Sequence, residues 1–167
     1  SKLDRREATK GFYNAHRALL LDFMDDPGAG AAYNALLDKD ISSSFRIIQH
    51  IGQYYERLGR SKKARTIYEK SRSHMPGTTL FDVAFKRLNS GVRPQKILRS
   101  ASDGVAEALF TVANSLRLQR AKETALVLAR LALYLRPNFG MAMVLVAEIL
   151  EEDKRYADAN VGYKRVA

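Results

Sequence analysis

The chain of 167 residues contains no cysteine. Disulfide bonds, thiol nucleophiles and thiolate metal sites are therefore excluded, whereas the redox compartment stays open because a cysteine-free chain suits either environment. Long apolar runs are also missing. The most apolar stretch, residues 124–135, is interrupted by Arg130 and is far shorter than the roughly 20 residues that cross a bilayer. With 46% apolar residues, the sequence indicates a folded chain with a continuous core and no membrane span.

Residue patterns for catalysis or metal binding are scarce as well. The three histidines, His16, His50 and His74, are scattered and lack partners at the i+3 or i+4 spacing that a metal favours. The acidic clusters at 25–26 and 151–153 do not have the spacing of a calcium loop. No glycine-rich phosphate loop is present either. We therefore expect neither an enzyme nor a bound metal or cofactor.

The first residues, 1–6, include no initiator methionine and no apolar signal segment. We therefore expect the sequence to be a fragment of a longer protein. The formal net charge is +10, and most of the excess is local. Residues 57–99 carry 12 Lys or Arg against two acidic side chains, so the middle of the chain could attract an anionic partner.

Apolar and small residues recur along the chain at fixed offsets. The second set of landmarks follows the first at i+61, and the third follows the second at i+34. The sets are Ile48, Ile51, Gly52, Tyr55, Ala64, Tyr68 and Pro76; then Leu109, Val112, Ala113, Leu116, Ala125, Ala129 and Pro137; then Met143, Val146, Ala147, Leu150, Ala159 and Tyr163.

This spacing predicts pairs of short antiparallel helices. Apolar residues at i, i+3 and i+7 form one stripe on a first helix, and a small residue on that stripe, such as Gly52, allows close approach of a second helix. Pro76 and Pro137 end their hairpins because proline has no amide hydrogen and clashes with the preceding turn. Leu58-Gly59 supplies the turn inside the first complete pair. The sequence therefore predicts an all-α fold.

The set from Ile48 to Pro76 resembles the tetratricopeptide (TPR) signature W-x2-L-G-x2-Y, A-x3-F and P, with Ile for Trp and Tyr for Phe. The resemblance is to degenerate arrays of the bacterial type, and it covers most of the chain. It implies one α-solenoid, a right-handed superhelix of about five antiparallel hairpins near residues 3–37, 43–76, 79–101, 104–137 and 139–167.

The third hairpin is expected to be shortened, because the offset i+61 divides into 34 and 27. Residues 79–88 would form its first helix, ended by the residues up to Gly91, and Pro94 would open a second short helix to about Ser100. Ser102 or Asp103 would then cap the next helix. The first hairpin is degenerate, with helices at 12–22 and 29–37 and one residue missing from the connection at 25–28.

The TPR resemblance implies a scaffold that binds a peptide or partner protein in a concave groove lined by first helices. The groove residues would be Arg46, Gln49, Gln53, Arg57, Phe110, Asn114, Arg117, Met141, Val144 and Glu148, with Phe12, Leu19, Asp22 and Phe23 extending the groove. Amides, charges and rings of this kind can bond a peptide backbone and hold an apolar side chain. An alternative is that these are solvated helix faces. The carboxylate clamp of chaperone-binding TPR proteins is absent, because Phe110 stands in place of a lysine.

A second interpretation is a module that binds an anionic polymer or surface, such as nucleic acid or acidic lipid, through hairpins 2 and 3. Its basic patch would consist of Lys62, Lys63, Arg65, Lys70, Arg93, Lys96 and Arg99. Nucleic acid is not expected as the partner, because interleaved rings for base stacking are lacking and a charge run is usually a solvated face.

A third interpretation is a non-catalytic regulatory segment of a larger enzyme. Residues 121–135 are apolar almost all round, so this helix is either sandwiched between neighbouring hairpins or contacts a second copy or flanking repeats. Degenerate arrays of this type favour a bacterial envelope or periplasmic location over the cytoplasm. The sequence names neither the partner nor the pathway.

Overall fold

The computed structural model describes residues 2–37 and 44–166, with residues 2–9 described by their backbone alone. Every regular element in these ranges is a helix, which confirms the predicted all-α class for this part of the chain. The contacts divide the chain into two compact units, Ser1–Arg99 and Ser100–Ala167, hereafter unit 1 and unit 2. The predicted hairpin limits at 43 and 167 lie outside the described residues.

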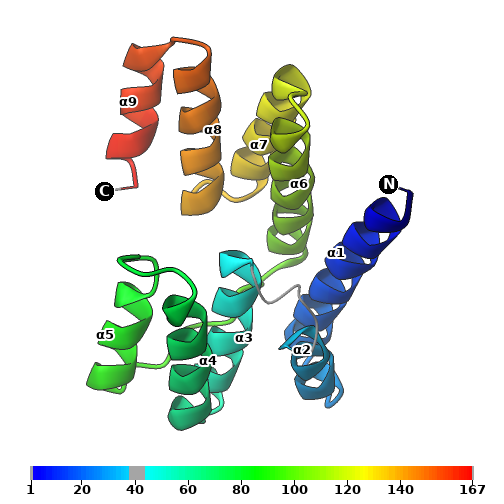
Figure 1. The fold of residues 1–167 in the computed structure, drawn as a ribbon, viewed down its shortest axis with the longest axis vertical. Coiled ribbons are helices and arrows are strands. Elements are labelled where there is room, and N and C mark those ends of the chain that lie inside the picture. The colour runs from blue at the N-terminus through cyan, green and yellow to red at the C-terminus, as the bar shows by residue number, and fades with distance from the viewer. Residues whose placement is uncertain (1, 38–43, 167) are drawn as a thin grey trace. The chain divides into compact units, whose positions relative to one another are not determined.

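Within each unit, helices that follow one another pack together (Figure 1). Unit 1 pairs α1 with α2 and α3 with α4, and α5 packs on α4. Unit 2 pairs α6 with α7 and α8 with α9, and α7 also contacts α8. The bounds are α1 Lys2–Phe23, α2 Ala29–Leu37, α3 Phe45–Arg57, α4 Ser61–Ser73, α5 Asp82–Ser90, α6 Ala101–Leu118, α7 Lys122–Leu135, α8 Gly140–Glu152 and α9 Tyr156–Lys164.

In the described parts of the chain, the same turn joins the helices of all four pairs. One residue adopts the left-handed conformation, and the next amide closes the turn by donating to a carbonyl in the last turn of the first helix. Successive left-handed residues are separated by i+34, i+61 and i+34, which are the offsets of the sequence landmarks. The left-handed residues are Asp25, Gly59, Arg120 and Lys154. The distance from the amide nitrogen to the carbonyl oxygen is 2.9 Å for Asp26 to Leu21, for Arg60 to Tyr55 and for Ala121 to Leu116, and 2.8 Å for Arg155 to Leu150.

The first pair is one residue shorter than the second. Asp25 and Gly59 are separated by i+34, whereas Tyr33 and Tyr68 are separated by i+35. The missing residue therefore falls after the left-handed position, where the Asp26 carboxylate accepts a hydrogen bond from the Gly28 amide at 2.7 Å. This agrees with the predicted deletion at residues 25–28.

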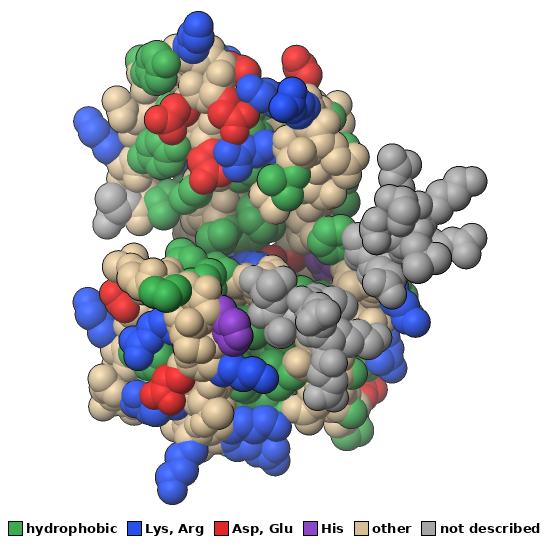
Figure 2. Space-filling view, viewed as in Figure 1, with side chains coloured by type: hydrophobic (Ala, Val, Ile, Leu, Met, Phe, Trp, Pro, Cys, Tyr) green, Lys and Arg blue, Asp and Glu red, His purple; other side chains and the backbone are tan. Residues whose placement is uncertain are grey.

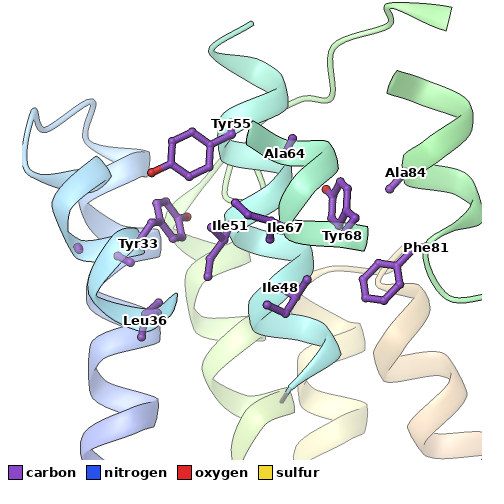
Figure 3. Packing of buried hydrophobic residues seen from close by; sticks show 12 residues of the cluster. Tyr33, Leu36, Ile48, Ile51, Tyr55, Ala64, Ile67, Tyr68, Phe81 and Ala84 are labelled. Carbon is purple, nitrogen blue, oxygen red and sulfur yellow. The ribbon is translucent and has the colours of Figure 1, made fainter. Parts of the chain in front are cut away.

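Gly52 of α3 packs directly against the ring of Tyr68 of α4. A Cβ atom added at Gly52 would lie 2.1 Å from Cζ of Tyr68, so only glycine fits there. Tyr68 is fully buried and belongs to a core that also contains Ile51 and Ile67. Figure 3 shows this core, in which side chains of α3 and α4 lie between Tyr33 of α2 and the α5 end of the unit.

Unit 2 uses smaller side chains at the corresponding contacts. Ala113 and Ala129, which stand at i+61 from Gly52 and Tyr68, are both fully buried in its core. In the last pair, a Cβ added at Gly162 of α9 would lie 3.0 Å from Cβ of Ala147 in α8. Side-chain size therefore differs between the pairs, although each of these pairs places a small residue of its first helix in the core.

The predicted second helix of the third hairpin, Pro94 to Ser100, is wrong. Residues 92–99, hereafter the connecting segment, contain no helix. Pro94 removes one amide donor and disfavours helical geometry at the residue before it. Two aliphatic side chains of the segment, Ile97 and Leu98, are buried against α1, and this long-range contact opposes formation of a short helix.

The predicted cap of α6 is also shifted. Ser100, and not Ser102 or Asp103, is the N-cap residue. Its hydroxyl accepts from the Asp103 amide at 3.1 Å, and the Asp103 carboxylate accepts from the Ser100 amide at 3.1 Å. This reciprocal capping box begins the helix earlier than the sequence suggested. At the other end of the connecting segment, Gly91 ends α5 in the left-handed conformation, as predicted.

The contact of Gly52 with Tyr68 predicts a mutation whose effect reverses sign. Gly52→Ala should lower the free energy of unfolding by about 1–3 kcal/mol through overpacking. In a Tyr68→Ala background the same change should be neutral or stabilising by up to about 1 kcal/mol, because alanine favours a helix over glycine. Urea unfolding of the four variants measures the coupling. Gly140→Ala, whose added Cβ would lie 3.6 Å from Val166, is the control and should cause no loss. Equal effects in both backgrounds would contradict the packing.

Candidate binding surfaces

The ten residues predicted to bind a partner lie on three helices and in both units. Four belong to α3 in unit 1, namely Arg46, Gln49, Gln53 and Arg57. Six belong to α6 and α8 in unit 2, namely Phe110, Asn114, Arg117, Met141, Val144 and Glu148. The two sets are therefore treated as separate surfaces.

On α3, Gln49 and Gln53 are both half-buried. They lie on the face opposite the buried stripe that contains Ile51. Arg46 donates to Oε1 of Gln49 at 2.7 Å. Arg57 is committed to structure, because it forms an ion pair with Asp22 of α1. The Gln53 amide and the amide nitrogen of Gln49 are thus the groups of this set best placed to bond a ligand.

In unit 2 the predicted ligand-binding face of α6 mainly joins this helix to α8. Phe110 is only 7% exposed, and its ring centroid lies 5.1 Å from that of Phe139, just before α8. Arg117 donates to Glu148 at 2.6 Å and to Glu152 at 2.6 and 2.9 Å. These contacts place Phe110 in the core and not among ligand-facing groups.

The remaining residues of this set are more accessible. Asn114 is exposed one turn before Arg117, and Met141 and Val144 are half-buried on α8. The surface left for a partner in unit 2 therefore consists of one amide and two apolar side chains, beside the Arg117 ion pairs.

A buried carboxylate, Glu56, organises the α3, α4 and α5 side of unit 1. Its side chain is 2% exposed. It accepts from the Tyr68 hydroxyl at 2.6 Å and from Arg87 at 2.9 and 3.1 Å. Burial, followed by this carboxylate, raises the pKa of Tyr68 above its ordinary value, so the tyrosine stays a neutral donor. The Glu56 network therefore joins α5 to α3 and α4.

The same tyrosine–glutamate pairing recurs at the surface of unit 2. Tyr163 follows Glu151 at i+12, as Tyr68 follows Glu56, and its hydroxyl donates to Oε2 of Glu151 at 2.8 Å. That hydrogen bond raises the pKa of Tyr163 to about 12. The spacing of 12 residues between glutamate and tyrosine is therefore a sequence signal for this contact. The repeat landmarks included the tyrosines but not the glutamates.

The basic patch contains cations with different roles. Lys63 donates to Asn34 at 3.0 Å, Arg65 donates to Asn89 at 2.7 Å, and Lys96 pairs with Asp25 at 2.6 Å. Arg99 donates to Gln95 at 3.2 Å. These four side chains connect parts of unit 1. The other three members of the patch, Lys62, Lys70 and Arg93, are exposed.

Figure 2 shows Lys and Arg side chains spread over the surface around α3, α4 and α5, interspersed with apolar and other side chains. A cavity of about 130 Å³ lies here, at the turn between α3 and α4. It is lined by Arg87, Arg93 and Glu56, together with neighbouring loop residues. Glu56 and Arg87 form an ion pair, so charged groups of both signs line the cavity. The cavity is therefore not a simple anion site.

Two contacts of the connecting segment were not anticipated. Ile97 and Leu98 pack on Leu19 of α1, and Lys96 reaches Asp25 just beyond the helix end. Their sequence signal is an aliphatic pair in an otherwise basic stretch that follows Pro94. Helical and strand periodicity do not reveal such a segment, because the aliphatic pair is too short to show a period.

Within residues 2–37 and 44–166, no three His, Asp or Glu side chains gather in a way that could hold a metal ion. Across those residues, no helix is both long and apolar enough to cross a bilayer.

Because Glu107 of α6 is buried, replacing its partner Arg136 should cost much more stability than replacing Arg155, whose partner is exposed. Glu107 is 1% exposed and accepts from Arg136 at 3.0 Å, whereas Arg155 and Asp158 form an exposed pair at 2.6 Å. Arg136→Met should cost about 3–5 kcal/mol, because it removes one partner of a buried ion pair. Arg155→Met should cost at most about 1 kcal/mol. Chemical denaturation of both variants checks this, and equal losses would contradict the assigned burial of Glu107.

Comparison with models of known protein families gives no match, and comparison with curated proteins finds no similar sequence.

Proposed function

We propose that the chain is a TPR-type scaffold that binds an extended peptide or a segment of a partner protein through its first helices. The recurrence of one helix–turn–helix geometry carries this proposal. The left-handed turn residues Asp25, Gly59, Arg120 and Lys154 are separated by the same two offsets as the buried small residues. Arrays of such pairs present extended surfaces that commonly serve recognition.

The side chains on these helices suit a peptide main chain. Gln49 and Gln53 on α3, and Asn114 on α6, carry amides that both donate and accept hydrogen bonds. Met141 adds an adaptable apolar contact on α8. An extended peptide exposes alternating amides and side chains, so it could bind the amides of α3 in unit 1 or, separately, the amide and the apolar side chain in unit 2.

The interpretation as an anion-binding module has less support. Lys63, Arg65 and Lys96 hold neighbouring segments of unit 1 together, so they are not simply a displayed row of cations. An anionic polymer would have to compete with these contacts. We therefore favour the peptide scaffold, and salt dependence separates the two interpretations.

A random peptide display library panned on the purified chain tests the proposal. Selected peptides should lose at least tenfold in affinity with the Gln49→Ala, Gln53→Ala double variant, because both amides bond the main chain. The Lys62→Ala, Lys70→Ala double variant on the outer side of α4 is the control and should bind unchanged.

The salt dependence of the selected peptides completes this test. Affinity for a peptide held by amides should change little between low and physiological salt. Selection of acidic peptides alone, with affinity that falls steeply with salt and depends on Lys62 and Lys70, would instead favour the anion-binding module. Failure to select any peptide would contradict the scaffold proposal.

A further inference from the structure

The connecting segment is held to α1 by side chains. Among the described residues, no backbone-to-backbone hydrogen bond is formed by residues 92–99. Pro94 fixes its own φ angle and restricts Arg93 to extended geometry. The segment is therefore an irregular strip of chain that can leave α1 without breaking any helix or sheet. In Figure 1 it leaves the end of α5 as a long irregular stretch.

Its apolar anchor is a cluster separate from the main core of unit 1. Ile97 and Leu98 are 8% and 6% exposed, Leu19 is 2% exposed, and Phe23 packs at the edge. Leu19 and Phe23 are four residues apart, so they lie on one face of α1. Two adjacent aliphatic side chains of the segment thus pack against one face of α1.

A charged contact fixes the register beside this anchor. The Lys96 ammonium donates to the Phe23 carbonyl at 3.3 Å and pairs with Oδ1 of Asp25 at 2.6 Å. The Phe23 carbonyl belongs to the C-terminal turn of α1, where the helix dipole favours a cation. The Lys96 ammonium also holds the pKa of Asp25 below its usual value. The helix end therefore recognises a basic residue directly before the aliphatic pair.

The face of α1 continues past the segment. Phe12 precedes Leu19 by seven residues, which places it on the same face, and it is 42% exposed. An apolar position is consequently available next to the occupied ones. A longer ligand could use Phe12 in addition to Leu19 and Phe23.

We propose that Leu19, Phe23 and Asp25 form a peptide-binding site, the α1 site, that takes a non-helical segment with a basic residue followed by two aliphatic residues. Residues 94–98 occupy this site in cis and compete with a partner of the same chemistry. The inference rests on the proposed scaffold function and specifies one of its sites and the class of peptide that it takes.

Tethering makes the cis segment an effective competitor. A short flexible connection gives an effective concentration in the millimolar range. For a peptide with an intrinsic dissociation constant near 0.1 mM, such a competitor weakens apparent binding by about tenfold. Release of the segment should therefore reveal affinity for a peptide added in trans.

The test uses the 167-residue chain and a fluorescent peptide with the sequence of residues 92–99, VRPQKILR. The release variant carries Ile97→Ser and Leu98→Ser, which remove the anchors but leave the α1 site intact. Fluorescence anisotropy should show about tenfold tighter peptide binding by this variant than by the unchanged chain. A folded release variant that binds no more tightly would overturn the proposal.

A charge swap tests the site itself. Asp25→Lys in the release variant should weaken binding by about fivefold, the upper range for an exposed ion pair. Lys154 occupies the equivalent left-handed position of the last pair, so the backbone accepts a lysine there. A peptide with Lys96→Glu should bind the Asp25→Lys protein better than the original peptide does. Equal affinity of both peptides would place the binding elsewhere.

A milder variant guards against misfolding of the release variant. Lys96→Glu alone keeps the aliphatic anchors and sets two carboxylates against each other, so trans binding should rise about twofold to fivefold. No rise in a folded Lys96→Glu protein would also contradict the cis contact.

These results are separable from the failure of the scaffold proposal. Library peptides that depend on Gln49 and Gln53, together with no gain in the release variant, would reject the α1 site and leave the scaffold standing. Binding of VRPQKILR to the release variant without any library binder would support the α1 site and reject the wider peptide scaffold.

Discussion

The architecture depends on how closely the two helices of each pair approach. Gly52 leaves no room for a Cβ beside the Tyr68 ring, and the ring is fixed in turn by Glu56. Because Glu56 also binds Arg87, the same contact determines where α5 lies. A single small residue on α3 thus connects local helix packing to the polar network of unit 1. In unit 2, Ala113 and Ala129 occupy the corresponding positions, so two small side chains take the place of the glycine and the ring.

Features that depend on neighbouring residues could be predicted from the sequence. The helices, the Gly59 turn and the small residues at Gly52 and Ala113 all follow from spacing and backbone preference. Even the single-residue deletion near Asp25 could be predicted, because a deletion shifts one landmark and leaves the other in place.

Features that depend on distant residues could not be predicted in the same way. Helical preference predicts a helix from Pro94 to Ser100, whereas Ile97 and Leu98 pack on Leu19 in a segment without a helix. Phe110 was predicted to contact a ligand, but its ring packs against Phe139, which follows α7 in the sequence. Such contacts join residues that no periodic pattern relates, so the sequence pattern does not indicate them.

The central claim is the register that sets Gly52 against the Tyr68 ring, and proton NMR tests it most directly. The account predicts nuclear Overhauser contacts between the Gly52 Hα protons and the Tyr68 ring protons. It also predicts Gly52 Hα shifts displaced from random-coil positions by the ring current. Random-coil shifts for Gly52, without any contact to Tyr68, would contradict the register on which the helix pairing, the α5 contact and the proposed binding faces depend.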